Sequence, residues 1–407
     1  MKRKKNILVV TSTFPRWKGD PVTARFVYDL AEALTRYYNV HILCPHTFGA
    51  KDHEVIDKME VFRFRYFYPS KFEQISAGEG MTANLREGIL PKLQILPFLI
   101  LETVKIIWLI KKRDIDLVNT HWMIPQGFLY ALIRRLCKVP HLMTVHAAGI
   151  FALMRFPLGK ITGKFIVKRT DDIIAVSSYI KKCINDLVEH DTHAHTLPMG
   201  IDTKKFAINK DRISLRNKYG IKSKYVLLFV GKLVPKKGLK YLIKAMEHLT
   251  KKIDDVELIV IGGGPLREAL ASQATKIGVG KYIKFIGWLD NDKLPEFYRL
   301  SDVVIVPSIV DEKGETEGMP VVIQEALSSG KPVIASRVSG IPDVIRDGYN
   351  GWLVKEKDPL ELSNKIAEVL RSSNLKTIRK NAILTARKYD WTEIARRYKE
   401  VIDKIIK

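Results

Sequence analysis

Short apolar runs alternate with amphipathic stretches along the whole chain, and this alternation constrains the fold more than any other feature. In the first half we expect strands at six apolar runs: 6–12, 39–45, 59–67, 115–121, 140–146 and 171–177. Between them, apolar residues recur with helical spacing at 25–37, 96–112, 126–136 and 159–169. Such a βαβ series predicts a parallel sheet with helices on both faces.

The series begins again after a break at "HTLPMGIDTKKF" (195–206), where Pro198 and Gly200 interrupt regular structure. Strands are then expected at 224–231, 256–262, 283–288, 302–308 and 332–337, and helices at 238–249, 264–278, 294–300 and 320–330. The sequence therefore predicts an α/β fold of two facing Rossmann-like domains, 1–198 and 199–388, with a cleft between them. We expect an amphipathic helix at 389–407 to cross back to the first domain.

The net charge of +24 is spread over the chain. Residues 1–200 hold 29 Lys and Arg against 18 Asp and Glu, and the remaining residues hold 39 against 26. An even excess of this kind favours long-range attraction to anions such as nucleotide phosphates, nucleic acids or anionic lipids. Solubility alone is the simpler interpretation.

The cysteines and the longest apolar stretch bear on location. Cys44, Cys137 and Cys183 lie far apart without metal-ligand spacing, which favours a reducing cytoplasm. The stretch 96–112 is interrupted by charged residues and is too short to span a bilayer, so we expect most of its apolar face to pack on the first sheet. The basic residues around it suggest the alternative of an anionic membrane surface; they are Arg86, Lys92, Lys105 and 111–113.

In a doubly wound sheet, ligands bind beyond the carboxyl ends of the strands, so the loops there are the candidates for chemistry. The glycines 262–264 would let a phosphate approach the backbone at a helix N-terminus, although a tight turn without a ligand would use the same glycines. Lys232, Lys236 and Lys237 follow an expected strand and suit a diphosphate, with a solvated basic loop as the alternative.

Two acids flank the start of an expected helix in "EGMPVVIQE" (317–325). Pro320 fits the first helical turn, which leaves the N–H groups of Gly318 and Met319 free just before it. Glu317 then lies in the loop and Glu325 inside the helix, where carboxylates can accept hydrogen bonds from sugar hydroxyls. An acid that favours the helix dipole and an unrelated surface acid would give the same pattern.

Two histidines end strands of the first half, His121 in "VNTH" and His146 in "MTVH". A histidine at a strand end can position protons near neutral pH, but a hydrogen-bonded structural histidine is equally expected. The loop 12–25 also follows a strand and contains Arg16, Trp17 and Arg25, which suit either an acceptor platform or an ordinary surface loop.

Taken together, these segments resemble family 4 of the retaining glycosyltransferases, which have the GT-B fold. The resemblance covers nearly the whole chain and rests on "PMGID", "FVGKLVPKKG", "VIGGGPL", "FIGWL", "DVVIVPS", "EGMPVVIQEALSSGKPVIAS", "SGIPDVI" and "DGYNGWLV". It implies an acceptor-binding domain at 1–198 and a nucleotide-sugar donor domain at 199–388. It also implies a catalytic role for His146 and Glu317, and substrate binding by Lys232, Lys237, Gly264, Trp288, Gly318, Met319 and Glu325.

Individual roles follow from the same resemblance. Lys237 matches the diphosphate-binding lysine, Glu317 the acid beside the donor sugar, Glu325 the ribose-binding acid, and His146 the histidine near sugar and acceptor; Trp288 lies where the base usually sits. Two positions depart from the family. Lys232 stands where Arg is usual, and His146 is followed by Ala-Ala-Gly where relatives often have Gly-Gly-Asp.

The resemblance implies a metal-independent hexosyltransferase without a cofactor, which moves a sugar from a UDP- or GDP-sugar to a lipid-linked or exopolysaccharide glycan. It would work in the cytoplasm, with the inner face of the membrane as a peripheral site. The rival interpretations are a nucleotide-sugar epimerase of the same fold, a basic nucleic-acid-binding protein and a nicotinamide dehydrogenase. We expect no nucleic acid as a partner, because no nucleic-acid-binding module is recognised. A nicotinamide dehydrogenase would need a complete glycine fingerprint after the first strand, and the sequence there has none.

Overall fold

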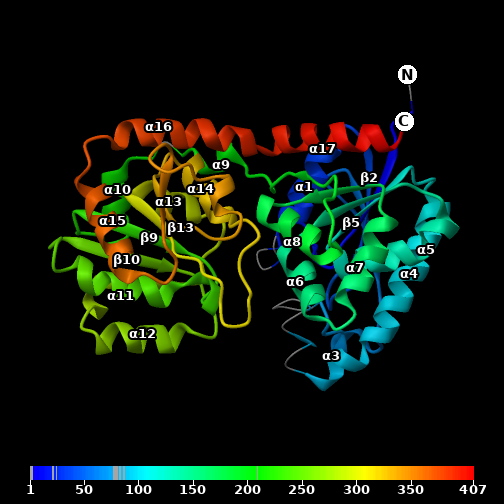
Figure 1. Cartoon of the computed structure of the whole chain (residues 1–407), viewed down its shortest axis with the longest axis horizontal. Helices are drawn as coiled ribbons and strands as arrows, with labels where there is room; N and C mark the ends of the chain where they lie inside the picture. The colour runs from blue at the N-terminus through cyan, green and yellow to red at the C-terminus, as the bar shows by residue number, and fades with distance from the viewer. Residues whose placement is uncertain are drawn as a thin grey trace. The chain divides into compact units, whose positions relative to one another are not determined.

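The apolar runs form two parallel sheets, each within its own compact unit of the computed structural model. The structure describes residues 3–20, 23, 25–76, 81, 84–85, 88–208 and 210–407. Unit 1 comprises Met1–Met199 with Trp391–Lys407, and unit 2 comprises Gly200–Asp390. Figure 1 shows the sheets with helices on their faces.

The sheet of unit 1 has the strand order β3-β4-β2-β1-β5-β6-β7-β8, in which β3 and β4 pair antiparallel and the other neighbours pair parallel. Its strands are β1 (Asn6–Val10), β2 (Asn39–Pro45), β3 (His53–Ile56), β4 (Met59–Phe64), β5 (Leu117–His121), β6 (His141–Val145), β7 (Asp172–Ala175) and β8 (His195–Thr196). Its helices include α1 (Phe26–Leu34), α3 (Ile89–Leu93), α4 (Ile95–Lys112), α5 (Phe128–Cys137), α6 (Ala147–Arg155), α7 (Gly159–Lys168) and α8 (Ser178–Val188).

The C-terminal helix α17 (Trp391–Ile405) is part of unit 1 although it follows unit 2 in sequence. Its buried face packs on α1, and Tyr38 Oη donates to Asp403 at 2.6 Å. Tyr398 is fully buried, with its hydroxyl 3.4 Å from that of Thr144 on β6. These contacts attach the end of the chain to the first sheet.

The sheet of unit 2 has the order β11-β10-β9-β12-β13-β14, and all its neighbours are parallel. Its strands are β9 (Tyr225–Val230), β10 (Val256–Ile261), β11 (Ile283–Gly287), β12 (Val303–Val306), β13 (Val333–Ser336) and β14 (Gly351–Val354). Its helices are α9 (Thr203–Phe206), α10 (Arg212–Lys218), α11 (Leu239–Leu249), α12 (Arg267–Lys276), α13 (Leu294–Leu300), α14 (Val321–Ser328), α15 (Pro359–Arg371) and α16 (Leu375–Ala386) among the described residues.

Both faces of the unit 2 sheet are buried, which explains why its strands are continuous apolar runs. On β9, Leu227 and Phe229 pack into the core on one face, while Val226 and Leu228 pack into the core on the other. This is the alternation of side chains that an extended strand imposes. The predicted αβ alternation is confirmed, whereas the sequence left α6, α8, α15, α16 and the edge strand β14 without assignment.

The apolar stretch 96–112 forms α4 as predicted, but its surroundings differ from the expectation. Phe98, Ile106 and Leu109 pack on the sheet of unit 1. A second apolar row, which includes Leu96, Ile100 and Val104, is exposed, so the prediction that most of the apolar face is buried was wrong. No helix in the described part of the chain combines the length and hydrophobicity that a bilayer crossing needs.

Glu102 of α4 is a buried acid held in its neutral form. Its Oε1 accepts a hydrogen bond of 3.1 Å from Gln126 Nε2, and burial raises its pKa to about 8. In the unfolded chain the pKa returns to about 4.5, so between these values only the folded state keeps the proton. Its contribution to stability is therefore complete at pH 4 and is lost as the pH rises through 8.

We predict that Glu102→Gln stabilises the protein at pH 8 and leaves stability near pH 4 almost unchanged. The amide retains an acceptor for Gln126 and cannot ionise, so it removes a slope of about 1.4 kcal/mol per pH unit. Urea unfolding at pH 4.5, 6 and 8 measures this, with Glu400→Gln on α17 as the control for an exposed acid. Equal destabilisation at every pH would contradict the assignment.

Candidate functional site

The order of strands in unit 2 creates a switch point between β9 and β12. From β9 the chain adds β10 and β11 on one side, and it then adds β12, β13 and β14 on the other. After β9 the chain therefore runs toward β10, and after β12 it runs toward β13, in opposite directions along the sheet. Doubly wound sheets bind ligands at the carboxyl ends of such a pair of strands. The loops at these ends carry Lys232, Lys236 and Lys237 after β9, and Glu317 after β12.

An ion pair joins the two loops. Lys237 Nζ lies 3.2 Å from Glu317 Oε2, and Lys236 Nζ lies 3.9 Å from Glu317 Oε1. Burial raises the pKa of the Glu317 carboxyl, but the charges of Lys237 and Lys236 outweigh burial, so the pKa lies below its usual value. Glu317 is thus an ionised carboxylate in a largely buried position.

The glycine between the lysines and the next helix fixes this contact. Gly238 has φ +68°, and a Cβ atom there would lie 1.8 Å from the carbonyl oxygen of Pro307. Ile309 N also donates to Lys236 O at 2.9 Å. The chain after β9 is therefore held against the chain after β12, which places the lysines at Glu317.

The predicted helix start after Glu317 is one residue later than expected. Pro320 is the N-cap residue rather than the first residue of α14, and Gly318 and Met319 precede it. The Ser339 hydroxyl donates to the carbonyl oxygen of Glu317. Ser339 thereby anchors the backbone at Glu317.

Glu325 lies just over one turn into α14 and is also buried. Its Oε2 accepts a 2.6 Å hydrogen bond from Tyr298 Oη. Burial raises the pKa of the Glu325 carboxyl, while Tyr298 and the charges of Lys205 and Lys237 act against that shift. The hydrogen bond orients one carboxylate oxygen and fixes the side chain.

Glycines connect the ends of the neighbouring strands. Leu233 N donates to Gly263 O at 2.8 Å, and Gly262 N donates to Gly287 O at 2.8 Å. Trp288 follows Gly287 and is exposed. The structure thus brings Trp288 and the glycine turn to the same sheet edge as the lysines, because β11, β10 and β9 are adjacent. Lys232 is exposed within this edge.

Three buried polar atoms near this edge make no hydrogen bond within the described part of the chain: Ser308 Oγ, Thr316 Oγ1 and Glu317 Oε1. Glu317 Oε1 is 3.9 Å from Lys236 Nζ, and burying polar atoms that make no hydrogen bond costs free energy. All three belong to the segment between β12 and α14, which carries Glu317. This concentration favours a polar ligand here.

The two strand-end histidines of unit 1 contact each other. His121 Nδ1 lies 3.0 Å from His146 Nε2, and the rings stack at a centroid distance of 5.2 Å. Burial lowers the pKa of His146 to about 3; burial, followed by the charge of His146, lowers the pKa of His121 well below its usual value. Both rings are therefore neutral at pH 7, and one nitrogen of the pair donates to the other.

The missing acid after His146 has a steric explanation. A Cβ atom at Gly149 would lie 3.1 Å from Trp122 Cβ and 3.2 Å from Met123 N, so a carboxylate side chain would be crowded there. In the first loop, Arg16 forms an ion pair of 2.7 Å with the buried Asp20, and Arg25 pairs with Asp29 at 3.3 Å. Arg16 thus stabilises the loop after β1, and Arg25 stabilises the first turn of α1.

The comparisons with known proteins agree with this geometry. The model for glycosyl transferases group 1 matches residues 211–389, and the model for glycosyltransferase family 4 matches residues 23–205. The two matches together span most of both units. The chain belongs to the family 4 glycosyltransferases.

The names of two relatives of this glycosyltransferase state the donor and the acceptor. A GDP-mannose-dependent alpha-(1-6)-phosphatidylinositol monomannoside mannosyltransferase of Mycolicibacterium smegmatis is 29% identical over 64% of this chain and 69% of the relative. A UDP-Gal:alpha-D-GlcNAc-diphosphoundecaprenol alpha-1,3-galactosyltransferase of Escherichia coli is 29% identical over 67% of this chain and 71% of the relative. Both names describe transfer from a nucleotide sugar to a lipid-linked acceptor.

The solved structures establish the fold of this glycosyltransferase. HepE of Anabaena, determined in complex with UDP, superposes with a TM-score of 0.73 at 19% identity, covering 98% of this chain and 100% of that one. The predicted GT-B fold of two Rossmann-like domains is therefore confirmed. The roles of the individual site residues in this chain stay predictions.

Sequence reasoning missed the groups that position the predicted residues. Tyr298, which binds Glu325, is in α13, and Ser339, which binds the Glu317 carbonyl, follows β13. Neither carries a local signal, because each acts through a contact across 22 or 27 positions of sequence. The hydrogen bond between His121 and His146 was likewise not predicted, although both residues were singled out.

We predict that Gly264→Ala destabilises unit 2 by about 1–3 kcal/mol, whereas Gly263→Ala is tolerated. Gly264 has φ +151°, and a Cβ atom there would lie 2.7 Å from Leu233 O and 2.8 Å from Leu233 N. At Gly263 an added Cβ meets nothing within 4 Å. Urea unfolding of the two variants provides the comparison, and equal stability of both would overturn the packing argument.

Proposed function

We propose that this glycosyltransferase moves a hexose from a UDP- or GDP-sugar to a lipid-linked or exopolysaccharide glycan, with retention of anomeric configuration. The observation that carries the donor site is the buried, ionised Glu317 held 3.2 Å from Lys237 at the switch point of unit 2. The activities for which these relatives are named support a nucleotide-sugar donor and a lipid-linked acceptor.

In this proposal the lysines bind the diphosphate. An incoming diphosphate draws Lys237 partly away from Glu317, while Lys232 adds a second positive charge without the bidentate geometry of Arg. The backbone N–H groups of Gly318 and Met319, at the start of α14, also suit phosphate or sugar oxygens. Gly264 allows the backbone to approach the ligand closely.

The same proposal assigns the polar groups of the donor. Glu325, oriented by Tyr298, accepts hydrogen bonds from the ribose hydroxyls, and Glu317 accepts from hydroxyls of the transferred sugar. The exposed Trp288 offers its ring to the base. His146 acts near the donor sugar and the acceptor, as a neutral group whose ring is held by His121.

The proposed reaction replaces one bond to the anomeric carbon with another on the same face. The bond from the anomeric carbon to the β-phosphate oxygen breaks, and its electron pair leaves with the nucleoside diphosphate. The acceptor oxygen forms the new bond and gives its proton to the departing phosphate oxygen. Lys232 and Lys237 stabilise the charge that develops on that phosphate. Lysine side chains therefore supply the positive charge, which supports a metal-independent mechanism.

Each domain has its own part in this proposal. Residues 199–388 bind the donor, and residues 1–198 bind the acceptor, with the helix 389–407 completing the first domain. A lipid-linked acceptor places the protein on the inner face of the membrane as a peripheral protein. The lipid acceptors in the names of these relatives and the net charge of +24 support this location.

We predict that UDP or GDP stabilises the protein and that Glu325→Gln weakens this binding by roughly 10- to 100-fold, because charge-assisted hydrogen bonds are lost. Thermal unfolding with UDP, GDP and ADP measures the effect; nucleotide at 100 times its Kd adds about 2.7 kcal/mol. Glu368→Gln on α15 is the matched control for an exposed acid. An unchanged unfolding temperature with every nucleotide would contradict the proposed donor site.

We also predict that the product has the same anomeric configuration as the donor and that chelation of divalent ions leaves the rate within about twofold. The first result follows from same-face attack, and the second from the charge of the lysines. NMR of the glycosylated product and assays with and without EDTA give both readouts. Inversion contradicts the mechanism, whereas a changed sugar nucleotide formed without acceptor would indicate an epimerase.

A further inference from the structure

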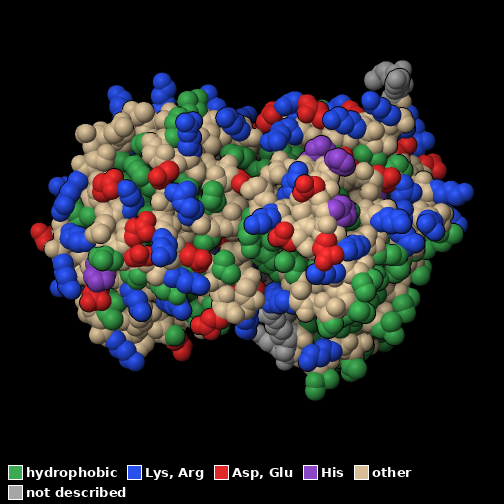
Figure 2. Space-filling model, in the orientation of Figure 1, with side chains coloured by type: hydrophobic (Ala, Val, Ile, Leu, Met, Phe, Trp, Pro, Cys, Tyr) green, Lys and Arg blue, Asp and Glu red, His purple; other side chains and the backbone are tan. Residues whose placement is uncertain are grey.

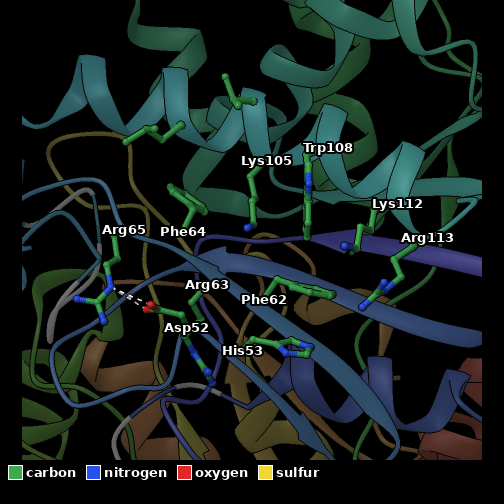
Figure 3. A pocket seen from close by; sticks show the side chains of 12 residues that line it. Asp52, His53, Phe62, Arg63, Phe64, Arg65, Lys105, Trp108, Lys112 and Arg113 are labelled. Atoms are coloured by element: carbon green, nitrogen blue, oxygen red, sulfur yellow. Dashed lines mark hydrogen bonds and ion pairs between the residues drawn. The ribbon is translucent and has the colours of Figure 1, made fainter.

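Unit 1 contains a second basic site that lies outside the proposed donor site. A cavity of about 540 Å³ separates α4 from the edge strand β3 and its neighbour β4. Its apolar walls come from Phe62 and Phe64 on β4, and from Leu101, Val104 and Trp108 on α4. Figure 3 shows Lys105, Trp108 and Lys112 directed from α4 toward Phe62.

The arginines of this cavity are already paired with acids. Arg63 Nη1 lies 2.7 Å from Glu54, and Arg65 Nε lies 2.8 Å from Asp52. Arg113 donates to both oxygens of Glu60, at 2.5 and 2.8 Å. These guanidinium groups therefore contribute little net charge to the cavity.

The two lysines differ from the arginines. Within the described part of the chain, no carboxylate pairs with Lys105 or Lys112. Their ammonium groups lie over the Trp108 ring, at 4.1 and 5.3 Å from its centroid. Two positive charges thus flank one partly exposed aromatic ring at the cavity, where they can attract an anionic group to an apolar surface.

An exposed apolar row leads from this cavity along the helices. It consists of Ile89, Leu93, Leu96, Ile100, Val104 and Trp108, all exposed and spaced three or four residues apart. Figure 2 shows hydrophobic side chains gathered over α3 and α4 at the lower right of the view. From Leu96 to Trp108 the row is about 18 Å long at 1.5 Å per residue. We call it the α3–α4 apolar row.

We propose that this face of unit 1 docks on an anionic membrane, with one lipid phosphate bound between Lys105 and Lys112 and the α3–α4 apolar row in the interfacial layer. The row fits the acyl boundary, and the two lysines at its end, which pair with no carboxylate of the described residues, fit the negative headgroup. Only the reason for docking rests on the proposed function, because docking would bring a lipid-linked acceptor to the enzyme. Lipid binding itself requires no catalysis.

Vesicle sedimentation with the full chain tests the proposal, using phosphatidylcholine vesicles with and without 30% phosphatidylglycerol. The double variant Lys105→Gln/Lys112→Gln is expected to bind the anionic vesicles about 10-fold or more weakly. The matched control is Lys376→Gln/Lys380→Gln, which removes two exposed charges at helical spacing from α16 of unit 2 and is expected to bind as the unchanged protein does. A second variant, Ile100→Ser/Val104→Ser, is expected to lose binding to a similar extent.

Soluble ligands distinguish the source of the phosphate. Short-chain dihexanoyl-phosphatidylglycerol is expected to change the fluorescence of Trp108, seen as the difference from Trp108→Phe, while inorganic phosphate at the same concentration is not. An equal response to inorganic phosphate would identify a free-phosphate site and overturn the lipid assignment. Equal loss in the α16 control, or equal binding to neutral vesicles, would also overturn it.

The same samples separate this inference from the donor site. Nucleotide binding by the lysine and serine variants is expected to match the unchanged protein, which also shows that they fold. Vesicle binding without any nucleotide binding would remove the proposed donor site and leave the docking face intact. Nucleotide binding without vesicle binding would overturn the proposed docking face and leave the donor site intact.

Discussion

The ion pair between Lys237 and Glu317 is the contact on which the proposed donor site depends. A buried carboxylate without a partner would take up a proton, and it would then lose its value as a charged acceptor. The lysines reach it only because β9 and β12 are neighbours, although β10 and β11 lie between them in sequence. Any side chain at position 238 would collide with the Pro307 carbonyl and keep the two loops apart, and Gly238 has none. Strand order and one glycine thus decide the protonation state of the acid.

The parts that the sequence predicted correctly are those with a local signal. Strands buried on both faces are continuous apolar runs, so the two series and the break between them were visible. The loops at the strand ends could be placed because parallel strands end at one edge. Tyr298 and Ser339 could not be found in this way, since their importance lies in one hydrogen bond each to a distant segment.

The error over α4 has a different cause. Hydrophobic periodicity indicates that a row of residues is apolar, but it does not say which of two rows meets the sheet. On α4, the row with Phe98, Ile106 and Leu109 packs inward, and a second row, which includes Leu96, Ile100 and Val104, is exposed. Glu102 is one of the charged residues that interrupt the apolar stretch in the sequence, yet its side chain is buried and neutral in the structure. Arg86, one of the basic residues predicted to surround this stretch, lies outside the described residues.

The two basic regions of the chain differ in how their charges are balanced, and this difference bears on function. At the proposed donor site, Glu317 partly neutralises Lys236 and Lys237, so in this proposal a diphosphate competes with a resident carboxylate and the nucleotide can leave after transfer. On α4, Lys105 and Lys112 meet only the face of Trp108 among the described groups, which leaves them available to lipid phosphates. Neither the apolar row nor two lysines alone would hold a protein firmly on a membrane, because stable attachment needs two signals acting together. In the proposed docking, their combination on one face would give attachment that is selective for anionic lipid and still reversible. An enzyme that draws its donor from water and its acceptor from a bilayer requires both properties.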